Sequence, residues 1–210
     1  WLDPWGLWSW RLLLLFCELA AVAVLAAVLR ETGQSMAGLA LYWWNPLVVK
    51  EVVNSAHMDV LMLPFMLGAL LLVIRRRHIS AATLLALAVG TKFFPLVLAP
   101  ILFRELTARP RRFAAVLGTL VVLTSAILIP YALAATGNQS GLVAYSGQWE
   151  MNDAFFMLLL WSFRSVSQIR GIDAATARWA TRIVVGCMFC GWIGWLARRP
   201  AESPADMSEK

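Results

Sequence analysis

The sequence predicts an all-α fold, a polytopic transmembrane helix bundle of about seven crossings that includes short re-entrant or hairpin helices. Of the 210 residues, 60% are hydrophobic and 14% are charged, and the mean hydropathy is +0.71. Soluble domains usually carry roughly a quarter charged residues. The composition therefore excludes a disordered chain and a disulfide scaffold, and it argues against an ordinary soluble enzyme.

The positive charges are grouped at the ends of apolar runs. The net charge is +6, and the arginine clusters lie at Arg75–Arg77, Arg104–Arg112 and Arg198–Arg199. Such groups are typical of short cytoplasmic loops, and tryptophans near the ends of apolar runs are typical of the membrane interface. The chain has eleven tryptophans. The placement of the positive charges thus indicates that the partner of the protein is a lipid bilayer, and it does not indicate nucleic-acid binding.

The first half of the chain contains three apolar runs before the first arginine cluster. Residues 12–29 are long enough to nearly cross a hydrocarbon core of about 30 Å. Met36–Val49 is shorter and contains Pro46, and Val60–Ile74 ends at the arginines. The polar stretch Lys50–Asp59 separates the last two runs, so it belongs to a loop outside the bilayer.

Residues 79–103 allow two interpretations. As one span they would place the flanking arginine clusters on opposite sides and bury Lys92, at about 2.5–3.5 kcal/mol. As a hairpin of two short helices, Ile79–Thr91 and Leu96–Phe103, they would keep both clusters on the cytoplasmic side. Pro95 disfavours helix at the residue before it. We prefer the hairpin.

The second half begins with a clear span, Phe113–Ala135, followed by a polar loop, Thr136–Asp153. Ala154–Phe163 would be only about 15 Å long, so we interpret it as interfacial or re-entrant. The alternative, that it crosses, stays open. Ile183–Leu196 is the last span.

With the N-terminus outside, three polar groups meet on the outer face: Glu51–Asp59, Lys92 and Glu150–Asp153. Ser55 could cap the following helix and place His57 and Asp59 in its first turn. Such a turn favours a carboxylate and suits a phosphate, and a histidine can move a proton near neutral pH. The alternative is a polar loop end with a capping aspartate.

Lys92 could place its ammonium on a lipid phosphate with its stem among acyl chains, or simply extend to the interface. Trp149 and Glu150 offer an aromatic face and a carboxylate, a combination that suits a sugar, although a solvated loop would look the same. His57, Asp59 and Glu51 lack a diagnostic ligand spacing, so no metal residues are assigned. No cofactor is assigned, and a divalent metal stays possible.

Three segments resemble the polyprenol-phosphate-mannose-dependent, bacterial alpha-mannosyltransferase-like family of GT-C glycosyltransferases. Trp44–Val48, Glu51 and Asn54–Met62 resemble its W-N-P-L…E…G-(N/H)-x-D-x-x-M stretch. Thr91–Pro95 is similar to its lysine-x-x-proline motif between two short helices, and Trp149–Phe156 to its W-x-x-N-x-x-(L/F)-F loop. Where the family commonly has Gly-Asn, this chain has Ser55-Ala56.

The resemblance implies transfer of a sugar, typically mannose, from a polyprenyl-phosphate donor to a glycan or glycolipid acceptor on the extracytoplasmic face of the cell membrane. It assigns Asp59 and His57 to catalysis, and Lys92 with His57 to the donor phosphate. The residues expected to hold sugar or acceptor are Glu51, Asn54, Trp149, Glu150 and Asn152. The rival class is a non-catalytic transporter or lipid-binding helix bundle, which also needs polar groups at helix breaks.

We also expect the chain to be a segment of a longer protein, since it begins with Trp1. Residues 1–200 would then be a partial membrane region and residues 201–210 a polar tail. The resembling enzymes carry an essential aspartate in an outer loop upstream of this region. The segment alone is therefore expected to be inactive.

Overall fold

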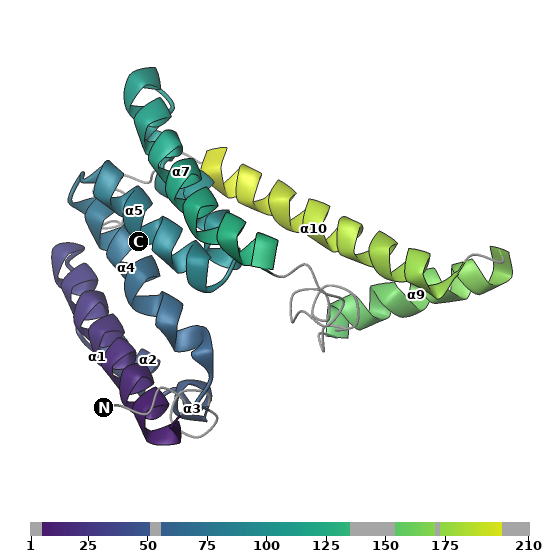
Figure 1. The fold of residues 1–210 in the computed structure, drawn as a ribbon, viewed down its shortest axis with the longest axis horizontal. Coiled ribbons are helices and arrows are strands. Elements are labelled where there is room, and N and C mark those ends of the chain that lie inside the picture. Colours follow the sequence, from purple (N-terminus) through teal and green to yellow (C-terminus); the bar gives the residue numbers. More distant parts are fainter. Residues whose placement is uncertain (1–5, 51–55, 135–153, 171–172, 199–210) are drawn as a thin grey trace, which may run out of the picture. The chain divides into compact units, whose positions relative to one another are not determined.

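The computed structural model describes residues 6–50, 56–134, 154–170 and 173–198. In these ranges every regular element is a helix, which confirms the all-α prediction (Figure 1). The chain divides into two compact units, Trp1–Pro130 and Tyr131–Lys210.

Three helices are long and apolar enough to cross a membrane. They are α1 (Leu7–Glu31), α7 (Pro110–Ala134) and α10 (Ala174–Arg198, apolar from Ala175). The shorter apolar segments Met58–Ile74, His78–Thr91 and Ala154–Val166 fall below that length. The described part of the chain is thus all-helical with three membrane-spanning candidates, and seven crossings are not confirmed.

Helix α1 is longer at both ends than the predicted run of residues 12–29. It ends in a left-handed turn at Gly33, whose φ is 67°. The N–H of Gln34 donates to the carbonyl of Leu29 at 2.8 Å, the six-to-one bond of a Schellman motif. Glycine adopts this conformation without strain, so the sequence stops the helix here.

The run Met36–Val49 is not one helix. It divides into α2 (Gly38–Trp43) and α3 (Pro46–Val48). The Asn45 side chain accepts a hydrogen bond from the Leu47 N–H at 2.9 Å, and Pro46 occupies the first position of α3. An asparagine cap followed by proline starts a new helix and ends the one before it.

Helices α4 (Leu63–Ile74) and α5 (His78–Thr91) form a hairpin. A short 3₁₀ helix, η2 (Met58–Met62), leads into α4. The turn between α4 and α5 is a second Schellman motif, with Arg76 at φ 59° and the Arg77 N–H donating to Leu72 at 2.8 Å. The first arginine cluster is therefore the turn itself.

The break and return of the preferred hairpin over residues 79–103 are present, but its second arm is not the single helix Leu96–Phe103. Helix α5 ends at Thr91, Lys92 is extended, and the chain returns through η3 (Phe94–Leu98) and α6 (Ala99–Leu102). Arg76 forms an ion pair with Glu105, which lies in η4 (Arg104–Leu106). The two flanking arginine clusters thus lie at the same end of the first unit.

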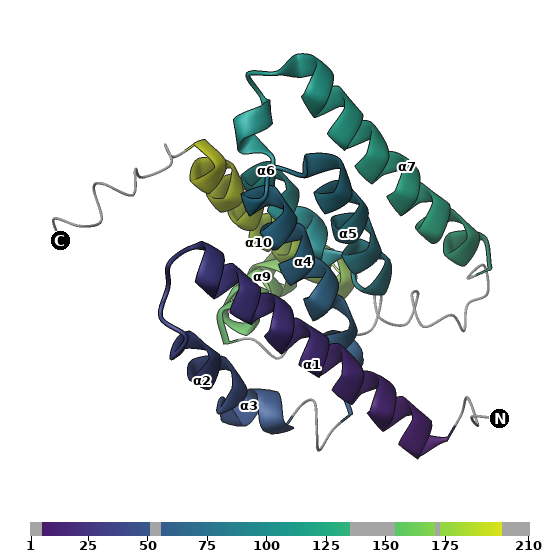
Figure 2. The ribbon, with the colours of Figure 1, turned by 90° about the vertical axis from the view of Figure 1, so that its left-hand side faces the viewer.

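The first unit has two chemically distinct ends. At the arginine end, the Arg75 Nε donates to Glu31 at 2.8 Å and joins the ends of α1 and α4. At the opposite end, the indole Nε1 of Trp10 donates to the carbonyl of Ala56 at 3.1 Å. Helix α1 runs between these ends beside α4 (Figure 2).

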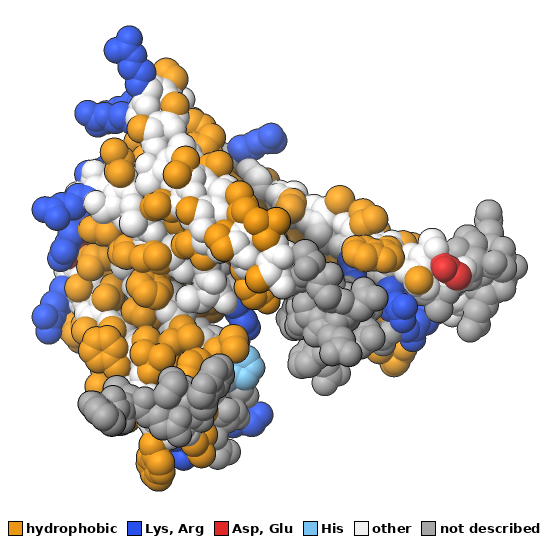
Figure 3. Space-filling view, viewed as in Figure 1, with side chains coloured by type: hydrophobic (Ala, Val, Ile, Leu, Met, Phe, Trp, Pro, Cys, Tyr) orange, Lys and Arg blue, Asp and Glu red, His pale blue; other side chains and the backbone are white. Residues whose placement is uncertain are grey.

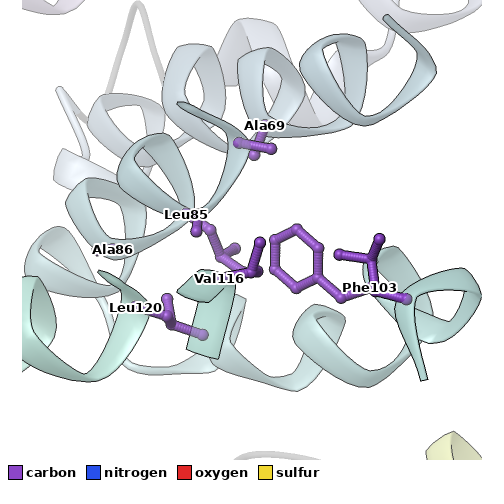
Figure 4. Close-up of a cluster of buried hydrophobic side chains, with 9 residues drawn as sticks. Ala69, Leu85, Ala86, Phe103, Val116 and Leu120 are labelled. Carbon is purple, nitrogen blue, oxygen red and sulfur yellow. The ribbon is translucent and has the colours of Figure 1, made fainter. Parts of the chain in front are cut away.

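The core of the first unit lies between α4, α5, α7 and the returning segment (Figure 4). Alanines on the facing sides of α4 and α5, among them Ala69 and Ala86, are fully buried and let the helices approach closely, as small residues do in membrane bundles. Leu85 and Phe103 fill the space toward α7. The buried cluster is Ala69, Ala81, Ala82, Leu85, Ala86, Phe103, Leu106, Val116 and Leu120.

The variant Leu85→Ala is expected to destabilise the first unit by about 2–5 kcal/mol, because it opens a cavity in this core. Leu85 is fully buried, whereas Leu87 on the same helix is 38% exposed. Leu87→Ala is therefore the matched control and should cost much less. Unfolding of both variants in detergent, followed by circular dichroism, compares them. Equal losses would contradict this account of the core.

In the second unit, α9 (Ala154–Arg170) packs against α10 (Ala174–Arg198). Helix α9 has 17 residues and continues beyond the predicted end at Phe163. Its serines do not break it, since Ser162 and Ser165 donate to backbone carbonyls four residues earlier. At about 25 Å, α9 is longer than the interfacial or re-entrant helix predicted for Ala154–Phe163, and it is shorter than a typical membrane span.

Candidate functional site

The candidate site lies at the end of the first unit opposite the arginines, where η2 begins. Ala56 has a φ of 49°, a left-handed conformation that favours glycine over residues with a side chain. The hydrogen bond from Trp10 to the Ala56 carbonyl holds this strained residue against the start of α1. His57 follows in extended conformation and is the residue before η2.

Asp59 stands at the centre of the site. It lies in the first turn of η2, where the helix dipole favours a carboxylate. Its Oδ1 atom lies 3.1 Å from the Nδ1 of His57 and forms an ion pair with the Nζ of Lys92. The same Oδ1 is buried, and the positive charge that faces it is that of Lys92, to which His57 adds a second one only when it is protonated.

Lys92 comes to the site from the end of α5. Helix α5 stops at Thr91, and the extended Lys92 that follows projects its ammonium onto Asp59. The Lys92 side chain is 34% exposed, and those of Asp59 and His57 are 44% and 50% exposed. The three groups are therefore held together and still accessible to a substrate.

The structure brings together three of the predicted site residues, His57, Asp59 and Lys92, through one carboxylate oxygen. In one detail the prediction is wrong: His57 precedes the helix and does not lie in its first turn, whereas Asp59 does. His57 has an extended backbone and is the residue just before η2, so the first turn of the helix begins one residue later, at Met58. The predicted residues Glu51, Asn54, Ser55, Trp149, Glu150 and Asn152 lie outside the described residues.

A metal centre of protein ligands is not found among the described residues, where no three His, Cys, Asp or Glu side chains group closely enough to hold an ion. His57 and Asp59 are adjacent, but their nearest neighbour is the cationic Lys92. The arrangement in the described part of the chain suits an anion or a proton transfer rather than a cation.

Trp10 is a site-supporting residue that the sequence did not reveal. Its position near the start of an apolar run predicts only an interfacial anchor, and its partner Ala56 is 46 positions away.

A second polar contact in the first unit joins Tyr42 and Glu18, where the Tyr42 hydroxyl donates to the Glu18 carboxylate at 3.0 Å. Glu18 is 4% exposed, so it faces the interior of the bundle, as polar residues in membrane helices usually do.

Comparison with known proteins gives the family. A family model described as "Alpha-(1->6)-mannopyranosyltransferase, N-terminal domain" matches residues 4–108, half of the 210-residue chain. No curated protein and no solved structure matches the chain. His57, Asp59 and Lys92 all lie within the matched segment, and the described parts of the chain include helices able to cross a membrane. The chain belongs to the alpha-(1->6)-mannopyranosyltransferase family, through that family's N-terminal domain.

Proposed function

We propose that the protein transfers mannose from a polyprenyl-phosphate donor to a hydroxyl of a glycan or glycolipid acceptor, on the extracytoplasmic face of the membrane. The observation that carries this proposal is the contact of Lys92 and His57 with one oxygen of Asp59 at a helix break. The family supports mannosyl transfer in general terms. What we propose beyond the family is the polyprenyl-phosphate donor, the glycan or glycolipid acceptor and the extracytoplasmic face.

The transfer reaction requires a positive charge beside the phosphate oxygen on which negative charge develops. The acceptor hydroxyl attacks the anomeric carbon, the bond from that carbon to the phosphate oxygen breaks, and the lipid phosphate leaves with the electron pair. A carboxylate takes the hydroxyl proton. Lys92, helped by His57, would stabilise the leaving phosphate, because a fixed cation acts most strongly where charge develops.

A lipid-linked donor fits the surface beside Lys92. The residues that follow it, Phe93, Phe94 and Leu96, are 55%, 51% and 44% exposed. A cation next to exposed apolar side chains can bind a phosphate and its hydrocarbon chain together. A nucleotide sugar, which carries no such chain, would not use this apolar surface.

The proposed face follows from the two ends of the first unit. At one end Arg75 pairs with Glu31 and Arg76 pairs with Glu105, and clusters of arginine usually stay in the cytoplasm. Asp59, His57 and Lys92 group at the other end, near Trp10. On this orientation the active groups open to the outside.

The donor can be tested with membranes that contain the full-length protein. We expect transfer of labelled mannose from polyprenyl-phosphate mannose to a mannan acceptor, and no transfer from GDP-mannose once endogenous polyprenyl phosphate has been removed. Transfer from GDP-mannose in such lipid-depleted membranes would overturn the proposed donor. Membranes without the protein provide the background rate.

A further inference from the structure

We propose that the arginine end of the first unit holds a second ligand site, a cleft that binds the phosphate of an anionic membrane lipid. The cleft has a volume of about 560 Å³ and lies between the start of α5 and the start of α7. It is at the opposite end of the unit from His57, Asp59 and Lys92. The site is therefore separate from the proposed donor site.

Four arginines line this cleft: Arg76 and Arg77 from the turn before α5, and Arg111 and Arg112 from the first turn of α7. Figure 3 shows Lys and Arg side chains gathered along the upper left edge of the molecule, where α7 begins. Arg76 is paired with Glu105. Among the described residues, no carboxylate pairs with the other three, so the cleft carries uncompensated positive charge.

The backbone adds donors to this charge. Helix α5 begins at His78 without a side-chain cap, so the N–H groups of its first turn have no partner within the helix. Together with the positive end of the helix dipole they favour an anion. Ser80 of the same turn lines the cleft and offers a hydroxyl. A phosphate with several acceptor oxygens can use arginines, N–H groups and hydroxyl at once.

The walls of the cleft indicate that the phosphate belongs to a lipid. Ile79 and Val116 line the cleft beside the arginines, and Ile79 is 56% exposed. Farther along α7, Val122 is 64% exposed and stands seven residues after Ala115 of the cleft, on the same side of the helix, so an apolar surface extends from the cleft along the helix. Basic clefts between membrane helices on the cytoplasmic side bind anionic lipid head groups in this way.

The test measures lipid binding to the full-length protein by native mass spectrometry in detergent, with phosphatidylglycerol and phosphatidylcholine as probes. The test variant is the pair Arg111→Gln and Arg112→Gln. The matched control is the pair Arg30→Gln and Arg198→Gln, which removes the same charge from helix ends that do not line the cleft. A third variant, Arg111→Lys with Arg112→Lys, keeps the charge, and circular dichroism checks that each variant is folded.

We expect the unmodified protein to prefer phosphatidylglycerol and the glutamine pair to bind it about tenfold more weakly. The control pair and the lysine pair should keep most of the preference. Equal binding of the two lipids, or an equal loss in the control pair, overturns the proposal. Inorganic phosphate serves as the soluble probe, and its displacement of the lipid at matched concentration would assign the cleft to free phosphate and overturn the lipid as its source.

Discussion

Lys92→Ala is expected to lower kcat/KM for mannosyl transfer from a polyprenyl-phosphate donor by about 10²–10³-fold. The ammonium of Lys92 is the cation that pairs with Asp59 at the site. Without it, the leaving phosphate would develop its charge beside the Asp59 carboxylate with only His57 to offset it. The donor KM should rise as well, because the same cation would bind the phosphate before the reaction.

Two variants control for the loss of a positive charge as such. Arg11→Ala removes a cation from the exposed start of α1, near the same end of the unit, and should leave the rate within about twofold. Lys92→Arg keeps the charge but changes its shape, so partial activity is expected. Unchanged transfer by Lys92→Ala would refute the proposed role of Lys92.

A loss of activity in these variants can be separated from a loss of folding. The Lys92 and Asp59 side chains are 34% and 44% exposed, and accessible ion pairs usually contribute about 0–1 kcal/mol to stability. The folded bundle should therefore tolerate removal of either partner. The thermal unfolding midpoint of each variant in detergent gives the check.

The break at Lys92 could be predicted from the sequence because two independent constraints agree there. Pro95 disfavours helix at the preceding residue, and a single span would have placed one arginine cluster outside against the usual charge bias. The ion pair of Arg76 with Glu105 places both clusters at one end, as the hairpin requires. The proline constraint and the placement of the arginines were together sufficient to predict the helix break at Lys92.

Other features depend on contacts that no local pattern encodes. The pairing of Lys92 with Asp59 joins residues on different helices, and apolar composition does not specify which faces of α4 and α5 meet. The continuation of α9 to Arg170 was missed because hydropathy falls after Phe163. Helix continues through polar residues as long as neither proline nor glycine interrupts it, so apolar length underestimates helix length.

Asp59→Asn is expected to lower kcat by about 10²–10⁴-fold with the donor KM unchanged or decreased. The amide keeps the shape of the side chain but removes the charge that attracts both Lys92 and His57. Lys92 would then be free to bind the donor phosphate more tightly, while it loses the partner that fixes its position. Asp59→Asn would thus lower kcat without raising the donor KM, whereas Lys92→Ala is expected to raise the donor KM.

Combining the two changes separates the possible roles of Asp59. If Asp59 acts only by positioning Lys92, adding Asp59→Asn to Lys92→Ala should cause little further loss, since the positioned group is already gone. If Asp59 also takes the proton of the acceptor hydroxyl, the double variant should lose a further factor of about 10² or more. The pH profile of kcat tests the same point: if Asp59 is the base, the acidic limb seen in Lys92→Ala should disappear in the double variant, and if another carboxylate is the base, the limb should remain in both.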